Sequence, residues 1–439
     1  MKKYFISGAM LAGLMSLAAC SNDEDVVADN NGAEQQFTIT LASSGDRATR
    51  AAADRTLESE AAGQSIEKVT LVVRSQDDNK VVYIHTLDNW NGTATDYDTN
   101  GHGKKLTFTI PKADKLGEGK YVVTAVGYNE GNYNLKLPAK GDVVDKNITA
   151  ITPADAEAKE VFAGEQKFSV SADKKIEGTD ASKAIQSVDV TLHRQVAGAY
   201  GYFTSIPAKI GETDVASIRM VSRSKNTVLT FGSFNSSFTT TDANVMYMVN
   251  GSVPATKTAK FLNGDEANVL FSAKIADWFP GGDAYKDGVY DKKDTNWTNP
   301  YTTGSYLKGS VFASNFIVPF SATQGKSTLE LQLLDATGNV LYAWPVKLDA
   351  SNDQISKTGE TASADLFGAG TAMGFAETAD VFSLFRNHIY SIGIHKQGTT
   401  NPDKTDPGTD EPTDLSKIQN VVIRVNDNWE ALHHMSIDE

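Results

Sequence analysis

The chain has 439 residues, a formal net charge of −14 and a single cysteine. The acidic balance argues against nucleic acid or an anionic membrane surface as a partner, because both require a basic face. One cysteine excludes disulfides within the chain and Cys-ligated zinc sites. After the N-terminal apolar run no segment reaches 18 apolar residues, so the sequence predicts no transmembrane helix.

The N-terminus resembles the signal peptide of a bacterial lipoprotein. Two lysines precede a short apolar stretch, Tyr4 to Leu14, and the lipobox-like Leu17-Ala18-Ala19-Cys20 follows. We expect residues 1–19 to be removed and Cys20 to carry the lipid, palmitate included. The acidic run Ser21 to Asp25 resembles the signal that sends some lipoproteins of Gram-negative anaerobes to the outer face of the outer membrane. The predicted location is therefore the cell surface.

The first predicted strand, Gln36 to Ser43, is followed by an arginine-containing loop. Phe37, Ile39 and Leu41 alternate with polar residues, which is typical of a half-buried strand. The next segment, residues 47–55, is small and polar and shows no apolar periodicity. It is either a flexible surface loop or a cleavage site, since exposed loops of small residues are preferred by proteases.

Three arginines in this loop are candidate cleavage sites for an Arg-specific surface protease. Arg50 fits best because three alanines follow it, and Arg47 is close behind. Arg55 is weaker because it lies nearer to Glu58 and Glu60. Cleavage at any of the three arginines separates the first strand from the rest of the chain.

The rest of the chain is a series of short strands with turn signals between them, which predicts two β-sandwich domains with few helices. In the first domain the predicted strands are 66–75, 81–86, 106–110 and 121–128, and a short helix is predicted over 153–159. In the second they are 185–196, 217–221, 227–231, 245–249, 259–261, 307–320, 328–334, 341–348 and 384–394. The expected division is a signal peptide 1–19, a propeptide with a removable strand 20–50, domains 51–178 and 179–397, and a leash with a donor strand 398–439.

An isolated strand follows a leash rich in Pro, Gly, Asp and Thr that runs from Gly398 to Asp414. In this strand, residues 418–425, one face carries Val421, Ile423 and Val425. The strand has no hairpin partner beside it in sequence, so it joins a sheet of its own domain or of another molecule. Its apolar face has the same period-two spacing as that of the first strand. This match indicates that either strand could occupy the same position in a sheet, which we call the slot.

The two strands together suggest a polymerisation switch. Excision of the first strand would leave unpaired N–H and C=O groups above apolar pockets. A strand of another chain could pair with such a surface. Three buried side chains contribute roughly 1.5 to 3 kcal/mol each, whereas association costs about 4 to 15 kcal/mol. Trp429, just beyond the last strand, is a candidate additional anchor. Before cleavage the chain's own first strand occupies the slot in preference to a strand of another molecule, because its effective concentration is high.

Several features of the chain recur together in one known family. They are the lipobox with its acidic follow-on, the strand before an Arg-containing loop, the strand Ile66 to Val73, the strand Leu192-His193-Arg194-Gln195-Val196-Ala197, and the run Arg386-Asn387-His388-Ile389-Tyr390-Ser391-Ile392 before the leash. In this order they resemble the fimbrillins of type V pili.

The resemblance implies two transthyretin-like antiparallel β-sandwich domains in a lipoprotein precursor that a surface protease cleaves after an arginine. It further implies strand exchange between identical or related subunits of a fimbrial shaft, which would take part in adhesion to host or bacterial surfaces. In that family the anchor subunit lacks the C-terminal donor strand. The tail of this chain therefore implies a shaft or tip subunit.

Catalytic and metal-binding motifs are not found in the sequence. It contains no Gly-x-Ser-x-Gly, His-Glu-x-x-His or P-loop motif, and Gly368-x-Gly370 with Gly374 misses the dinucleotide spacing by one residue. We therefore expect no enzyme activity, no cofactor and no metal. His433-His434 is interpreted as a solvated pair. Four aspartates in the segment 283–294 lack the EF-hand spacing and are interpreted as a solvated acidic loop.

The same loop supports an alternative function. Tyr285, Tyr290, Trp297 and Tyr301 are interleaved with carboxylates, a mixture that suits stacking on a sugar and hydrogen bonding to its hydroxyls. The other interpretation is that these aromatic residues pack the loop against the second domain. A glycan-binding surface lipoprotein, or a fimbrial tip adhesin that combines both functions, is therefore the alternative prediction.

Overall fold

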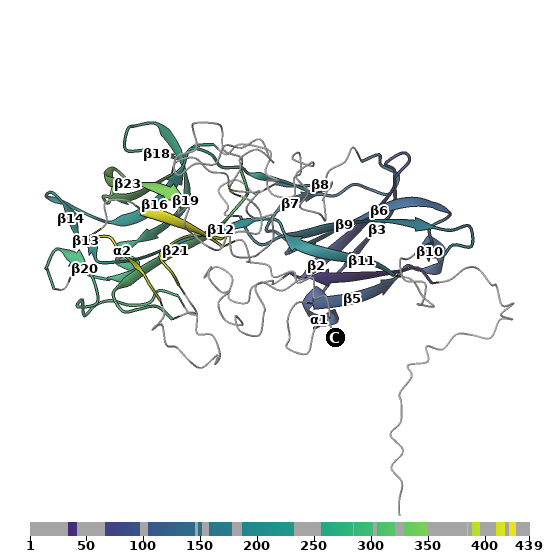
Figure 1. Cartoon of the computed structure of the whole chain (residues 1–439), viewed down its shortest axis with the longest axis horizontal. Helices are drawn as coiled ribbons and strands as arrows, with labels where there is room; N and C mark the ends of the chain where they lie inside the picture. The colour runs from purple at the N-terminus through teal and green to yellow at the C-terminus, as the bar shows by residue number, and fades with distance from the viewer. Residues whose placement is uncertain are drawn as a thin grey trace, which may run out of the picture.

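Figure 1 shows the fold as a computed structural model, which describes residues 34–41, 66–96, 104–144, 148–151, 158–177, 187–231, 256–283, 285–301, 305–320, 329–348, 384, 389–395, 410–417 and 421–426. Within these ranges the helical elements are short: α1 (Trp90–Thr93), η1 (Lys112–Asp114) and α2 (Ile275–Trp278). All other regular elements are strands. The predicted mainly β fold is confirmed, and no described helix is long and apolar enough to cross a membrane.

The first sheet has nine strands and closes around one hydrophobic core. Its order is β3-β2-β6-β9-β11-β1-β5-β4, with β10 paired to β9. The strands are β1 (Gln36–Leu41), β2 (Lys68–Ser75), β3 (Val81–Leu87), β4 (Thr95–Asp96), β5 (Lys104–Thr109), β6 (Gly119–Tyr128), β9 (Phe162–Val170), β10 (Ile176–Glu177) and β11 (Ser187–Arg194).

The second sheet has ten strands in the order β18-β19-β16-β22-β23-β26-β24-β12-β21, with β25 paired to β12. The strands are β12 (Ala197–Thr204), β16 (Ser217–Ser222), β18 (Ala259–Lys260), β19 (Glu266–Lys274), β21 (Ser310–Ile317), β22 (Leu329–Leu334), β23 (Val340–Leu348), β24 (Ile389–Ile392), β25 (Thr413–Asp414) and β26 (Val421–Asn426).

Three small sheets complete the described structure. Two are short pairs, β13 (Ile206–Pro207) with β20 (Val289–Tyr290) and β14 (Lys209–Ile210) with β15 (Thr213–Asp214). The third joins β7 (Asn134–Lys136) and β8 (Ile148–Ile151) to β17 (Val228–Phe231). In the chain, β17 lies between β16 and β18 of the second sheet, and β7 and β8 lie between β6 and β9 of the first. This third sheet therefore connects the two halves of Figure 1.

In each large sheet one strand turns the corner between the two layers of the sandwich. In the first sheet β11 pairs with β1 through residues 187–192 and with β9 through residues 193–194. The backbones approach closely here, because a Cβ on Gly164 of β9 would lie 1.9 Å from the carbonyl oxygen of Thr191. A buried ion pair of 2.6 Å between Arg194 and Glu160 lies at the end of β11.

The passage from the first sheet to the second lies later in the chain than expected. The sequence places the boundary at residues 178/179, but β11 pairs with β1 and β9, and β12 is the first strand of the second sheet. Strand β10, which ends at Glu177, and β11, which begins at Ser187, both belong to the first sheet. The division into domains 51–178 and 179–397 stays a prediction.

Three long strands are absent from the sequence prediction: β9, β12 and β19. Strand β12 shows the reason most clearly, since all but its last residue are buried and it contains two glycines. A strand buried on both faces shows no alternation of apolar and polar residues. Most of the predicted helix over 153–159 and the whole predicted strand over 245–249 lie outside the described residues.

Candidate functional site

The first strand lies in the interior of its sheet. Strand β1 pairs in parallel with β11, from Gln36 opposite Ser187 to Leu41 opposite Leu192. On its other side β1 pairs antiparallel with β5 along its whole length. The other neighbour of β5 is the two-residue strand β4. In this sheet β5 and β4 are therefore joined to the other strands through β1.

The inward face of β1 is part of the hydrophobic core of the first sheet. Phe37 and Ile39, two of the three predicted apolar residues, are 0% exposed. The ring of Phe37 packs edge-on against the ring of Phe168, with 5.5 Å between the centroids. On the opposite face the hydroxyl oxygens of Thr38 and Thr107 are 3.2 Å apart. Removal of β1 would therefore open the core as well as the hydrogen-bond ladder.

A buried glutamine fixes the start of β1, and the sequence analysis did not identify it. Gln35 is 0% exposed. Its side-chain amide donates to the carbonyl oxygens of Leu116 and Lys174, both at 2.9 Å, and its Oε1 accepts from the backbone N–H of Leu116 at 2.8 Å. Its own carbonyl accepts from Ile110 N–H at 2.8 Å. Gln35 therefore connects β1 to the segment after η1 and to the β9–β10 turn.

The last strand lies in the second sheet of its own chain, coloured yellow in Figure 1. Residues Val421–Ile423 of β26 pair in parallel with β23, and residues Arg424–Asn426 pair antiparallel with β24. Strand β26 is thus the corner strand of the second sandwich, with described pairings to β23 in its first half and to β24 in its second. The side chains of β26, among them the predicted donor residues Val421, Ile423 and Val425, lie outside the described residues.

The end of the leash is bound to the second sheet, although the sequence predicts a flexible segment as far as Asp414. Ile394 and Glu411 exchange two backbone hydrogen bonds of 2.8 Å, and β25 pairs in parallel with β12. Leu415 is only 3% exposed, and its N–H donates to the carbonyl oxygen of Thr204 at 3.0 Å. We call residues 410–417 the docked segment; it precedes β26 directly.

A buried polar cluster anchors the start of the docked segment. The carboxylate of Asp410 lies 3.8 Å from Nε2 of His395, and both side chains are buried. The His395 ring stacks on Tyr306 with 4.7 Å between the centroids. Burial raises the pKa of the neighbouring Tyr202 hydroxyl, and the charge of Asp410 adds to this effect. Gly393, with φ of +77°, allows the backbone to pass close to the carbonyl oxygen of Tyr202.

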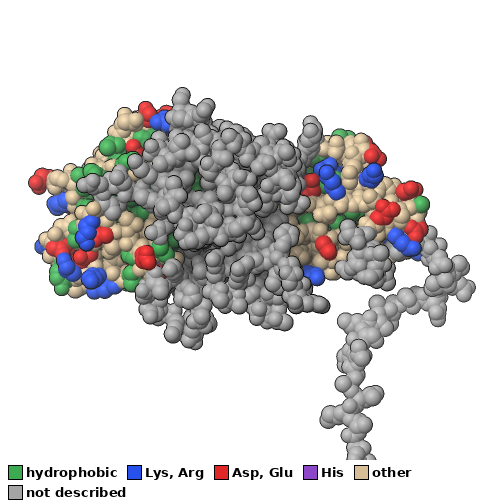
Figure 2. Space-filling view, viewed as in Figure 1, with side chains coloured by type: hydrophobic (Ala, Val, Ile, Leu, Met, Phe, Trp, Pro, Cys, Tyr) green, Lys and Arg blue, Asp and Glu red, His purple; other side chains and the backbone are tan. Residues whose placement is uncertain are grey.

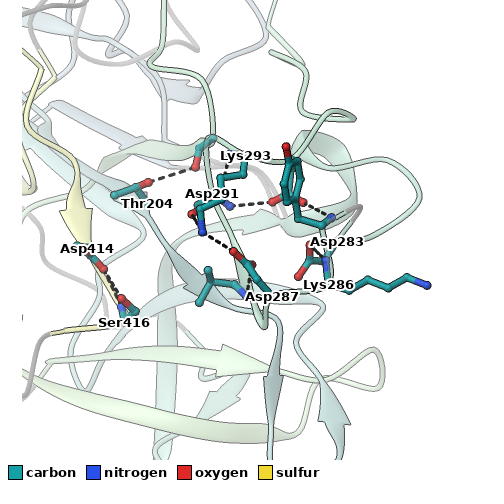
Figure 3. A network of polar contacts seen from close by, with 12 residues as sticks. Thr204, Asp283, Lys286, Asp287, Asp291, Lys293, Asp414 and Ser416 are labelled. Atoms are coloured by element: carbon teal, nitrogen blue, oxygen red, sulfur yellow. Dashed lines mark hydrogen bonds and ion pairs between the residues drawn. The ribbon is translucent and has the colours of Figure 1, made fainter.

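The acidic loop is held together by its own hydrogen bonds, as Figure 3 shows. Asp294 is buried and accepts from the N–H groups of Asp291 at 2.8 Å and Tyr285 at 3.2 Å. Lys293 contacts Asp287 at 2.6 Å and Asp291 at 3.6 Å. The bond to Lys293 lowers the pKa of Asp287. No group of three or more His, Cys, Asp or Glu side chains in the described part of the chain is placed to hold a metal ion.

Most of the aromatic residues in this region pack inward. The indole N–H of Trp297 donates to the carbonyl oxygen of Ser310 at 2.7 Å, and Trp297 and Tyr301 both contact Trp278. Tyr290 is buried. Tyr285 is 55% exposed, whereas Trp297 and Tyr301 are half-buried. Tyr290, Trp297 and Tyr301 therefore pack against their own domain, and a sugar-binding role of this loop stays a prediction.

The remaining predicted site residues lie outside the described residues. They are the lipidation site Cys20, the cleavage candidates Arg47, Arg50 and Arg55, the anchor Trp429 and the pair His433-His434. The side chain of Leu41 is also outside the described set. These assignments remain predictions from the sequence.

Comparisons with known proteins find similarity at the level of solved structures. No family model matches the chain, and no curated protein matches it by sequence. Similar solved structures include the fimbrial anchor protein Mfa2 from Porphyromonas gingivalis, at 10% identity and a TM-score of 0.35, with 90% of this chain and 98% of that one covered.

Two further fimbrial structures are similar to this chain. A fimbrial assembly protein from Parabacteroides distasonis is 12% identical with a TM-score of 0.36, and the match covers 83% of this chain and 92% of that one. The tip fimbrial protein Mfa3 from P. gingivalis is 9% identical with a TM-score of 0.30, and 81% and 94% are covered. Each name describes that protein, and identities this low transfer no activity to this chain.

Proposed function

We propose that the chain is a structural subunit of a cell-surface fimbrium, which polymerises by protease-gated exchange of strands and mediates adhesion. The observation that carries the proposal is the place of β1 in its sheet. This strand, which precedes the arginine-containing loop 47–55, is interior and fills the core between β11 and β5. Cleavage in that loop makes β1 a separate peptide, and its departure would leave a slot that suits another strand.

The pairing of the last strand supports it as the occupant of that slot. Every residue of β1 pairs with both β11 and β5, and in the described part of the chain residues 421–423 of β26 pair with β23 and residues 424–426 with β24. Both strands have six residues, and both have one parallel and one antiparallel neighbour. A copy of β26 from a second subunit is thus compatible with the ladder of the slot.

Proteolysis gates this exchange through effective concentration. Burial of Phe37 and Ile39 together contributes about 3 to 6 kcal/mol, and the backbone ladder adds to this. An intact chain also supplies β1 at a high local concentration that a second molecule does not match. Cleavage after Arg50 or Arg47 removes that advantage. It also separates the subunit from Cys20, so the predicted lipid holds the precursor in the outer membrane and the mature subunit is held in the fibre.

Limited proteolysis tests the proposal directly. Protein that starts at Ser21 is treated with a limiting dose of trypsin and examined by size exclusion and negative-stain microscopy, beside a copy truncated after Lys417. This truncation keeps the docked segment and removes β26, so it is the matched control. We expect fibres or ladders from the longer form only, with a new N-terminus at Ala48, Ala51 or Thr56. Cleaved long protein that loses β1 and stays monomeric would refute the proposal.

A further inference from the structure

The slot that β1 occupies has a polar end, and this end determines how an incoming strand must lie. At Gln35 the slot presents one backbone donor, the N–H of Leu116, and two backbone acceptors, the carbonyl oxygens of Leu116 and Lys174. Beyond it the slot takes apolar side chains at Phe37 and Ile39. A buried group that loses its partner costs stability, so an occupant needs an amide side chain two residues before its apolar face.

We propose that Gln419 of a second copy takes the place of Gln35 and thereby sets the register of strand exchange. Two segments of the chain agree at the position of the buried amide and at the three apolar positions. They are Gln35-Gln36-Phe37-Thr38-Ile39-Thr40-Leu41 and Gln419-Asn420-Val421-Val422-Ile423-Arg424-Val425. Both begin with a glutamine, continue with a second amide, and then place three apolar residues at every second position. This inference rests on the proposed function and adds the residue that specifies the fit.

Other registers in the same direction fail at the polar end. Side chains of a strand alternate between two faces, so a slip of one residue points the apolar face outward. A slip of two in one direction places Val421 against the three backbone polar groups. The opposite slip of two places Lys417 there and puts Gln419 into the apolar pocket of Phe37. Only the proposed register satisfies both the polar and the apolar part of the slot.

The reverse direction of insertion also fails. If the three apolar residues entered the slot in the opposite order, Asp427 would occupy the position of Gln35. An ionised carboxylate accepts hydrogen bonds but donates none, so it cannot satisfy the two carbonyl oxygens and would face them at close range. Either direction leaves one parallel and one antiparallel neighbour, because β1 is parallel to β11 and antiparallel to β5, so the polar end of the slot decides the direction.

The first test changes the glutamine and its neighbour in the full chain that starts at Ser21. Q419E has nearly the same shape but no N–H to donate, and N420A alters the residue that corresponds to the more exposed Gln36. After trypsin treatment we expect Q419E to assemble at least about tenfold more slowly than the wild type, and N420A to remain within about twofold. Thermal unfolding of the uncleaved proteins controls for loss of fold.

The second test locates the register by cross-linking. In the proposed register Val422 occupies the position of Thr38, whose hydroxyl is 3.2 Å from that of Thr107. Two chains, one with T107C and one with V422C, are mixed, cleaved and oxidised; a disulfide between them is expected because the two side chains are within bonding reach. A T107C chain mixed with an R424C chain reports reversed insertion or the slip of two residues that brings Val421 to the position of Gln35.

The outcomes separate this inference from the proposed function. If the wild-type protein does not assemble after cleavage, the proposed function is wrong, and the proposed register of strand exchange is refuted with it. If it assembles and Q419E assembles equally fast, or if T107C links to R424C instead of V422C, strand exchange stands and the role of Gln419 is refuted. Slow assembly of Q419E together with the T107C–V422C disulfide supports the inference.

Discussion

The first and last described strands of this protein have the same length but are held differently. Strand β1 pairs on both sides along its whole length and starts at a buried glutamine with four hydrogen bonds. Among the described pairings, residues 421–423 of β26 lie beside β23 and residues 424–426 beside β24, and the docked segment that precedes the strand is bound to the second sheet. The strand proposed to be removed therefore occupies a position with backbone partners along both edges and a buried polar end. The strand proposed to be donated is held at the corner between β23 and β24.

The largest expected effect separates the two faces of β1. Phe37→Ala removes a fully buried ring that packs on Phe168, and we expect a loss of about 3 to 5 kcal/mol in the free energy of unfolding of the first domain. Thr40→Ala, at a partly exposed position of the same strand, is the matched control. Urea unfolding of the uncleaved protein measures both. Equal stability of the two variants would show that β1 is not part of the core.

The next effect concerns the polar start of β1. Gln35→Ala leaves the N–H of Leu116 and two carbonyl oxygens without this partner, which we expect to cost about 2 to 4 kcal/mol in stability. Gln36→Ala removes a side chain whose hydrogen bonds are exposed and is expected to change stability by less than about 0.5 kcal/mol. The same unfolding assay applies, and a reversed order of the two variants would contradict the assignment.

A smaller effect is expected where the docked segment meets β24. Gly393→Ala places a Cβ 2.5 Å from the carbonyl oxygen of Tyr202 at a φ of +77°, so we expect a loss of about 2 kcal/mol and faster hydrogen exchange at Glu411 and Leu415. Gly338→Ala has a similar φ of +88° but open space around its Cβ. It controls for backbone strain alone. Unchanged exchange in the docked segment would show that this contact does not hold it.

The smallest effect is a pH dependence of the turn between β22 and β23. Asp335, in the turn between β22 and β23, accepts hydrogen bonds from Thr337 and Asn339, which lower its pKa to about 2. A depressed folded-state pKa contributes stability above the unfolded pKa near 4, and this contribution is lost as the pH falls from about 4 to about 2. We expect weaker protection from hydrogen exchange in β23 over that interval, measured as the exchange rate relative to the intrinsic rate at each pH. Asp335→Asn should show no such acid step from this group.

The strands with period-two alternation or with a run of β-branched apolar residues were predictable from their residues. Period-two alternation identifies β1 from Phe37 and Ile39, and the apolar runs identify β2 and β6. The doubly buried β12 was missed because its Ala, Gly and Tyr residues show no polar face. Gln35 was missed because one polar residue before a strand usually faces water. An alignment of the two terminal strands, Gln35 with Gln419, was the available signal.

The sequence alone determined the strand-rich class, the two terminal strands with matching apolar faces and the leash between the second domain and β26, because these depend on local periodicity and composition. Only the tertiary structure decided that β1 is interior to its sheet, that β11 belongs with β1 and β9, and that β26 turns the corner of the second sandwich. Strand neighbours are set by contacts between residues far apart in the chain. Local sequence patterns do not depend on those contacts. The sequence therefore shows which face of a strand is apolar, whereas the neighbouring strands become known only from the fold.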